Sequence, residues 1–176
     1  MCYIMGITLQ VQGANILGVF TTQSPSHLII HMSIAKALAE RGHNVTVLSA
    51  LEPPISHPDI KHIIIPPTEQ TQQEYNQLVV SSSGEKINLW NTVITFSKKN
   101  KILIDSQLDP LMDSRFTRLY ETSQFDLVIL GFYKVNDFQL GVAAKFKCPV
   151  IISWAHIPMP IVNVYVGNPN AISYVR

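Results

Sequence analysis

Charged residues are scarce in this chain, and the few basic ones are dispersed. Charged residues make up 14% of the 176 positions, and the net charge is +1 with histidine neutral. The one dense basic cluster is Lys98, Lys99 and Lys101. Proteins that bind nucleic acid neutralise phosphates with clustered Lys and Arg. The composition therefore gives little support for a nucleic-acid partner.

Long apolar runs and cysteines are lacking as well. No run approaches the roughly 20 apolar residues that span a bilayer, and the two cysteines are Cys2 and Cys148. Residues 1–13 are mildly apolar without Lys or Arg, and Val11 and Gly13 suit a signal-peptide cleavage site. We interpret this segment as a poor or truncated signal peptide rather than a disordered leader. Its removal would leave one thiol, which excludes an intrachain disulfide.

Apolar residues are plentiful and fall into short runs. They make up 47% of the chain, enough for a core, and we expect one domain over residues 14–176. Strands are expected near residues 15–20, 44–48, 60–65, 126–130 and 150–152. Helical patterns alternate with these runs. The alternation predicts a doubly wound α/β domain with one parallel, Rossmann-like sheet.

The stretch from Ala14 to Leu48 shows this pattern most clearly. An apolar run ends at Phe20, a polar loop follows, and apolar residues then recur at helical spacing from Leu28. Ser26 is the expected N-cap of that helix, and Gly42 stands where a left-handed C-cap belongs. A second apolar run follows at once. This strand–loop–helix–strand order favours a right-handed parallel crossover.

Later segments give weaker helical signals. Residues 70–83 predict a short helix and a mobile loop, and residues 87–96 and 138–146 predict further helices. Asp109-Pro110 is a helix-start signal, with Asp as N-cap and Pro in the first turn. The helix after it would carry an apolar face, which forms either core or the wall of an apolar ligand pocket. That face consists of Leu111, Met112, Phe116, Leu119 and Tyr120.

His27 is the first candidate for chemistry. In open parallel sheets, ligands bind beyond the carboxyl ends of the strands, where the loop carrying His27 is expected. A position in the first helical turn disfavours a positive charge and therefore favours neutral imidazole, the state that a general base needs. The alternative from position alone is a histidine that caps or packs at the loop end.

Two other kinds of site are disfavoured. His31 lies four residues after His27, a spacing that can begin a zinc site, but no third ligand follows at a telling spacing. We therefore expect His31 to pack or to line a pocket. Only Gly18 precedes the helix, so the three-glycine dinucleotide pattern is absent and a nicotinamide cofactor is not expected.

Six short blocks follow one another in the chain: Ala14-Asn-Ile-Leu-Gly-Val-Phe, Ser24-Pro-Ser-His27, Ala39-Glu-Arg-Gly-His43, Asn44-Val-Thr-Val, Phe125-Asp-Leu-Val-Ile and Phe146-Lys-Cys-Pro-Val-Ile. In this order they resemble the amino-terminal half of membrane-associated UDP-glycosyltransferases, particularly the insect enzymes. The resemblance covers nearly all of residues 14–176. It implies one half of a two-domain GT-B-type enzyme whose second domain holds most of the nucleotide-sugar site.

The resemblance also implies roles for particular residues. His27, by its match to the family's Ser-His, would take the proton of the acceptor. Relatives carry an acidic residue where this chain has Gly131, so the orienting carboxylate is in question. Asp137 is the candidate replacement, with helix N-capping as its alternative role. Acceptor contacts are expected from aromatic and histidine side chains near the strand ends: Phe20, His31, Phe132, Trp154 and His156.

The sequence thus leaves two functions open. The first is the acceptor-binding half of an enzyme that moves a hexosyl group from a UDP-sugar to a hydroxyl of a lipophilic small molecule, without metal or other cofactor and inactive in isolation. The second is a non-catalytic module that binds lipophilic molecules or pairs with a full-length relative or a second copy. Family resemblance implies the lumen of the endoplasmic reticulum, with membrane association and a role in detoxification.

Overall fold

Five parallel strands form one sheet at the centre of the protein. The computed structural model describes residues 13–81, 89–132, 136–156 and 167, so residues 1–12 lie outside it. The strands are β1 (Asn15–Phe20), β2 (Asn44–Ser49), β3 (Ile60–Ile64), β4 (Leu127–Phe132) and β5 (Val150–Trp154). Their order across the sheet is β3-β2-β1-β4-β5, and every neighbouring pair is parallel. The expected fold class is confirmed.

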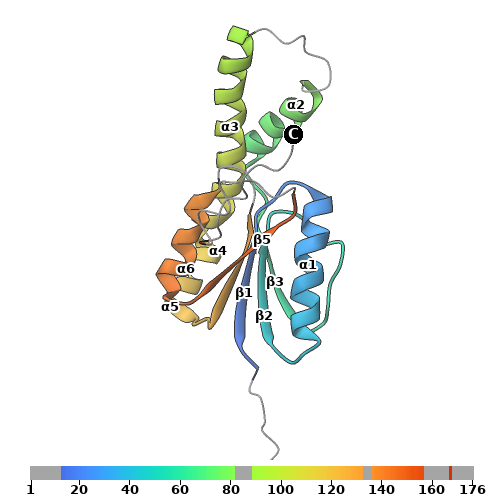
Figure 1. Ribbon diagram of the computed structural model, residues 1–176, viewed down its shortest axis with the longest axis vertical. Coiled ribbons are helices and arrows are strands. Elements are labelled where there is room, and N and C mark those ends of the chain that lie inside the picture. Colours follow the sequence, from blue (N-terminus) through green and yellow to red (C-terminus); the bar gives the residue numbers. More distant parts are fainter. Residues whose placement is uncertain (1–12, 82–88, 133–135, 157–166, 168–176) are drawn as a thin grey trace, which may run out of the picture.

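Side chains of β1 alternate between the two faces of the sheet, because successive residues of a strand point to opposite sides. Ile16 and Phe20 face α1 (Pro25–Ala39) and pack with Leu28 and Met32. Leu17 belongs to the core on the other face. Short helices cover that face: α4 (Ser114–Thr117), α5 (Leu119–Thr122) and α6 (Leu140–Phe146), as Figure 1 shows.

Helix α1 begins earlier than the sequence suggested. Its N-cap is Ser24, not Ser26, and Pro25 occupies the first turn. Proline suits that turn because its fixed φ is helical and its absent N–H would have had no partner inside the helix. Gly42 follows the helix with φ of +85°, as expected for a left-handed cap.

Helices α2 (Glu69–Ser81) and α3 (Leu89–Met112) pack together and project beyond the carboxyl edge of the sheet (Figure 1). The prediction of a helix start at Asp109-Pro110 was wrong, because both residues lie in the last turns of α3. The expected loop after α2 falls largely outside the described residues.

The apolar face expected after Asp109 is divided among three helices. Leu111, Phe116 and Leu119 are buried in the core, and Tyr120 packs against them. Met112 is exposed. Four of the five side chains are therefore core, and the alternative of a pocket wall is wrong for them.

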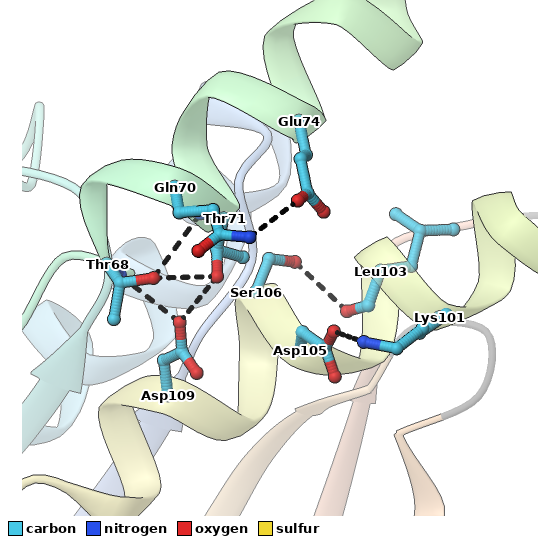
Figure 2. A network of polar contacts seen from close by, with 9 residues as sticks. All are labelled: Thr68, Gln70, Thr71, Glu74, Lys101, Leu103, Asp105, Ser106 and Asp109. Atoms are coloured by element: carbon cyan, nitrogen blue, oxygen red, sulfur yellow. Dashed lines mark hydrogen bonds and ion pairs between the residues drawn. The ribbon is translucent and has the colours of Figure 1, made fainter.

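Asp109 joins the two projecting helices instead of starting one. Its Oδ2 accepts hydrogen bonds from the backbone N–H of Thr68 at 3.2 Å and from the hydroxyl of Thr71 at 2.9 Å. Figure 2 shows the carboxylate pointing toward both threonines at the beginning of α2. The first N–H groups of a helix have no partner within it. Asp109 therefore supplies a cap to α2 from another helix.

We predict that Asp109→Ala lowers the free energy of unfolding by about 1 kcal/mol, as loss of a helix cap does. Amide exchange in the first turn of α2 should become faster at the same time. Asp105→Ala is the matched control, because Asp105 pairs with Lys101 on the surface of the same helix, and such a pair contributes about 0.5 kcal/mol or less. Equal effects of the two substitutions on α2 would contradict the capping role.

Candidate active site

The carboxyl edge of the sheet contains a switch point between β1 and β4. The chain leaves β1 toward α1 on one face and leaves β4 toward η1 (Asp137–Gln139) and α6 on the other. Loops part at such a point and open a crevice, where ligands of doubly wound sheets bind. His27 is the third residue of α1 and lies at this edge.

Aromatic side chains connect His27 with the ends of β4 and β5. The ring of His27 meets that of His156 edge-on, with centroids 4.4 Å apart. The ring of His156 lies 5.7 Å from that of Trp154, which lies 6.0 Å from that of Phe132. Four residues predicted from separate parts of the sequence are thus brought together.

The environment of His27 favours its neutral form. Partial burial lowers the pKa of the imidazole, and the neighbouring His156 lowers it further. A neutral imidazole at pH 7 can accept a proton. The structure thus places a proton acceptor in the crevice, in a partly shielded position.

A small cavity of about 190 Å³ lies beside His27. Its walls come from the β1–α1 loop and from the inner faces of α2 and α3: Thr22, Gln23, Ser24, His27, Tyr75, Leu103, Ser106 and Gln107. Pockets that enclose a whole drug-sized molecule usually measure about 300–1,000 Å³. This cavity therefore has room for one end of such a molecule.

Buried amides fix the loops around the switch point. The Nε2 of Gln139 donates to the hydroxyl of Thr21 at 2.6 Å, which ties η1 to the end of β1. The Nδ2 of Asn136 donates to Gln107 Oε1 at 2.9 Å and to the carbonyl of Gly131 at 3.2 Å. These residues are buried, so the bonds form out of water and hold the edges of the crevice in register.

His31 is buried one turn after His27. Its Nδ1 and the hydroxyl of Ser153 share a hydrogen bond of 2.8 Å, and its ring stacks on Phe20 with centroids 5.1 Å apart. Burial, with a smaller effect of His27, lowers its pKa to about 4. His31 therefore packs between α1 and the sheet, as the sequence favoured over a metal ligand. Within the described residues, no three His, Cys, Asp or Glu side chains gather as metal ligands would.

Two other candidates stand apart from the aromatic group. Phe20 is fully buried under α1, where it contacts His31. Asp137 is exposed and is the first residue of η1, whose N-cap is Asn136. The prediction that Asp137 is the N-cap of the following helix was therefore wrong by one residue.

Sequence reasoning missed Ser153, Thr21, Gln139 and Asn136. Each pairs with a residue at least 29 positions away or from another element. The signal in the sequence was a polar residue beside apolar ones at a strand end, such as Ser153 between Ile152 and Trp154. Such a residue needs a partner when it is buried, but the sequence does not name that partner.

Comparison with known proteins confirms the resemblance to UDP-glycosyltransferases. UDP-glycosyltransferase UGT4 of Dactylopius coccus is 26% identical over 167 residues, which cover 93% of this chain. UDP-glycosyltransferase UGT5 of the same organism is 29% identical over 168 residues, or 92% of this chain. No protein-family model matches. The matched parts are 31% and 30% of the relatives, so the chain spans about a third of their length.

We predict that His31 makes folding stability fall in acid. The unfolded chain protonates this residue near pH 6.5 and the folded chain near pH 4. Stability is therefore full above about pH 6.5 and declines as the pH falls toward 4, by up to roughly 3 kcal/mol. Urea unfolding at pH 7.0 and 4.5 measures the decline.

His31→Gln, which cannot titrate, is the comparison for this measurement. The pKa values of His27 and His62 are also lowered, so the variant should keep a smaller acid-dependent loss rather than none. An identical loss in both proteins would show that His31 is not held neutral.

Proposed function

We propose that this chain is the acceptor-binding part of a glycosyltransferase that transfers a hexosyl group from a UDP-sugar to a hydroxyl of a lipophilic molecule. The observation that carries the proposal is His27, whose pKa is lowered and which lies beside a cavity between the β1–α1 loop and helices α2 and α3. The similarity to UDP-glycosyltransferases over most of the chain supports the reaction class.

In the proposed reaction the acceptor hydroxyl lies at His27. Its oxygen attacks the anomeric carbon of the sugar while the bond from that carbon to the UDP oxygen breaks. The bonding pair leaves with UDP, and the hydroxyl proton passes to His27. No other cofactor is needed, because the imidazole supplies the base and the diphosphate is the leaving group.

The aromatic group supports a lipophilic acceptor. The ring of His156 lies next to His27, Trp154 lies beside His156, and the buried Phe132 packs behind Trp154. Aromatic side chains give large apolar contact areas. The polar wall formed by Thr22, Ser24 and Ser106 suits the hydroxyl end. An acceptor would therefore lie with its hydroxyl inward and its apolar part along the rings.

The remaining functions of a whole enzyme are assigned by resemblance. We propose that binding of the UDP-sugar needs a second domain, that these 176 residues alone do not turn over, and that the whole protein works in the lumen of the endoplasmic reticulum at the membrane. Among the described helices, none is long and apolar enough to cross a bilayer. By the same resemblance we propose a role in detoxification.

A non-catalytic binding module is the second candidate function. Glycine at position 131, where the resemblance implies an acidic residue, favours it. Such a module would bind lipophilic molecules, or pair with a relative or a second copy, without transferring sugar. Turnover in a completed enzyme distinguishes it from a transferase.

We predict that planar phenols bind the chain without metal or nicotinamide. Titration with 1-naphthol, followed by calorimetry, should show saturable binding that neither EDTA nor NAD changes. Trp154→Ala should weaken binding because it removes a ring beside His156, whereas Met112→Ala, an exposed residue of α3, should not. Binding that required added zinc, or that NAD displaced, would argue against this site.

We predict that His27→Ala abolishes transfer in a chimera that joins this chain to the remaining sequence of UDP-glycosyltransferase UGT4. Loss of a general base lowers the rate by about 10²–10⁴-fold. The stability cost should be within roughly 1 kcal/mol, because His27 lies at the surface end of the helix. Release of UDP in the presence of 1-naphthol measures transfer, with the unsubstituted chimera as reference.

Asp137→Asn in the same chimera tests the second residue. If Asp137 orients the imidazole, the substitution should slow the chemical step markedly. If it serves only the helix terminus, Asn serves about as well and the rate should hardly change. We expect the smaller effect, since Asp137 is exposed. Normal turnover after His27→Ala would refute the mechanism, whatever Asp137 did.

A further inference from the structure

Position 131 of β4 has no room for a side chain. A Cβ added to Gly131 would lie 2.9 Å from Cδ2 and 3.0 Å from Nε2 of His31, and 3.1 Å from Cδ1 of Phe20. Carbon atoms in contact normally stay at about 3.5–4.0 Å. The imidazole of His31 therefore fills the space that any larger residue at this position would need.

His31 cannot easily vacate that space. It is 1% exposed, and it is held from β5 by the hydroxyl of Ser153 and from β1 by the ring of Phe20. Gly131 and Ser153 are direct partners in the β4–β5 ladder. Gly131 and Ser153, side by side in the sheet, thus form the surface against which the buried imidazole of His31 packs.

The location matters because of what lies one helical turn away. His27 and His31 are four residues apart on α1, and the two imidazoles influence each other electrostatically. A base such as His27 is commonly oriented by a carboxylate. A side chain near the end of β4 would be suited to that task, since β4 borders β1 and its loop to α1. Here that position is closed.

We propose that the buried His31–Ser153 pair, one helical turn from His27, takes the place of a carboxylate at the end of β4, which makes His31 a positioning residue and keeps position 131 a glycine. The inference rests on the proposed role of His27 as the base. A neutral imidazole in this position adds no positive charge to oppose protonation of His27. It also offers no negative charge to stabilise the protonated form. The protonation of His27 would thus be set without a charged partner at position 131.

The experiment exchanges the two side chains in the full 176-residue chain. Gly131→Asp alone should lower Tm by about 10 °C, because the added side chain overlaps the ring of His31 and brings a carboxylate into a buried position. Gly131→Asp combined with His31→Ala should recover much of that loss. In the double variant the pKa of His27, measured by NMR titration, should rise by about one to three units, as a carboxylate within reach causes.

Gly141→Asp is the matched control, because a Cβ at Gly141 in α6 would have no neighbour within 4 Å. It should leave Tm and the pKa of His27 nearly unchanged. Gly131→Asp with wild-type Tm would show that His31 does not close position 131. An unchanged His27 pKa in a folded double variant would refute the replacement of a carboxylate, whereas the chimera with His27→Ala tests the base itself.

The role of Ser153 is tested by removing its hydroxyl and then restoring it. Ser153→Ala should shift the ¹⁵N resonance of His31 Nδ1, and Ser153→Thr, which keeps a hydroxyl, should largely restore it. A shift of the His27 pKa in the alanine variant and its return in the threonine variant would support positioning through His31. Identical His31 and His27 resonances in all three proteins would overturn the part assigned to Ser153.

Discussion

The pairing of β1 on both of its edges is the constraint on which the rest of the structure depends. β1 is parallel to β2 on one side and to β4 on the other. Its backbone groups are satisfied within the sheet, and its side chains fill both cores. The chain must then leave this strand and β4 toward opposite faces. The crevice that holds His27 results from this divergence, rather than from any special loop sequence.

Much of the fold could be predicted because local and global signals agree in it. Apolar runs such as Ile16–Phe20 are strands in a sheet covered on both faces. The helix start at Asp109-Pro110 failed because an equally good local signal served a tertiary contact. Asp109 caps a helix 41 residues away. Pro110 lies in the last turn of α3, where it gives up only its own hydrogen bond to the carbonyl four residues before it.

The site was predictable in its members but not in its contacts. Strand order brings the ends of β1, β4 and β5 together, so His27, Trp154 and His156 could be foreseen from parallel topology. The packing of His31 against Gly131 could not. It depends on how closely α1 approaches β4, where the absence of a side chain at Gly131 leaves room for the ring of His31. A glycine at a strand end does not indicate, in the sequence, that an aromatic ring packs over it.

The cap from Asp109 joins α2 and α3 at their ends nearest the sheet. If the two helices tilt together about Asp109, taken as the pivot, each residue moves in proportion to its distance from it. Along α3, with about 1.5 Å of rise per residue, Ser106 lies about 4.5 Å and Lys98 about 16 Å from the pivot. A tilt of about 5° displaces Ser106 by about 0.4 Å and Lys98 by about 1.4 Å. Such a tilt would thus move the wall of the cavity beside His27 less than any more distant part of α3. The distal turns of α3 can shift while the cavity keeps its shape.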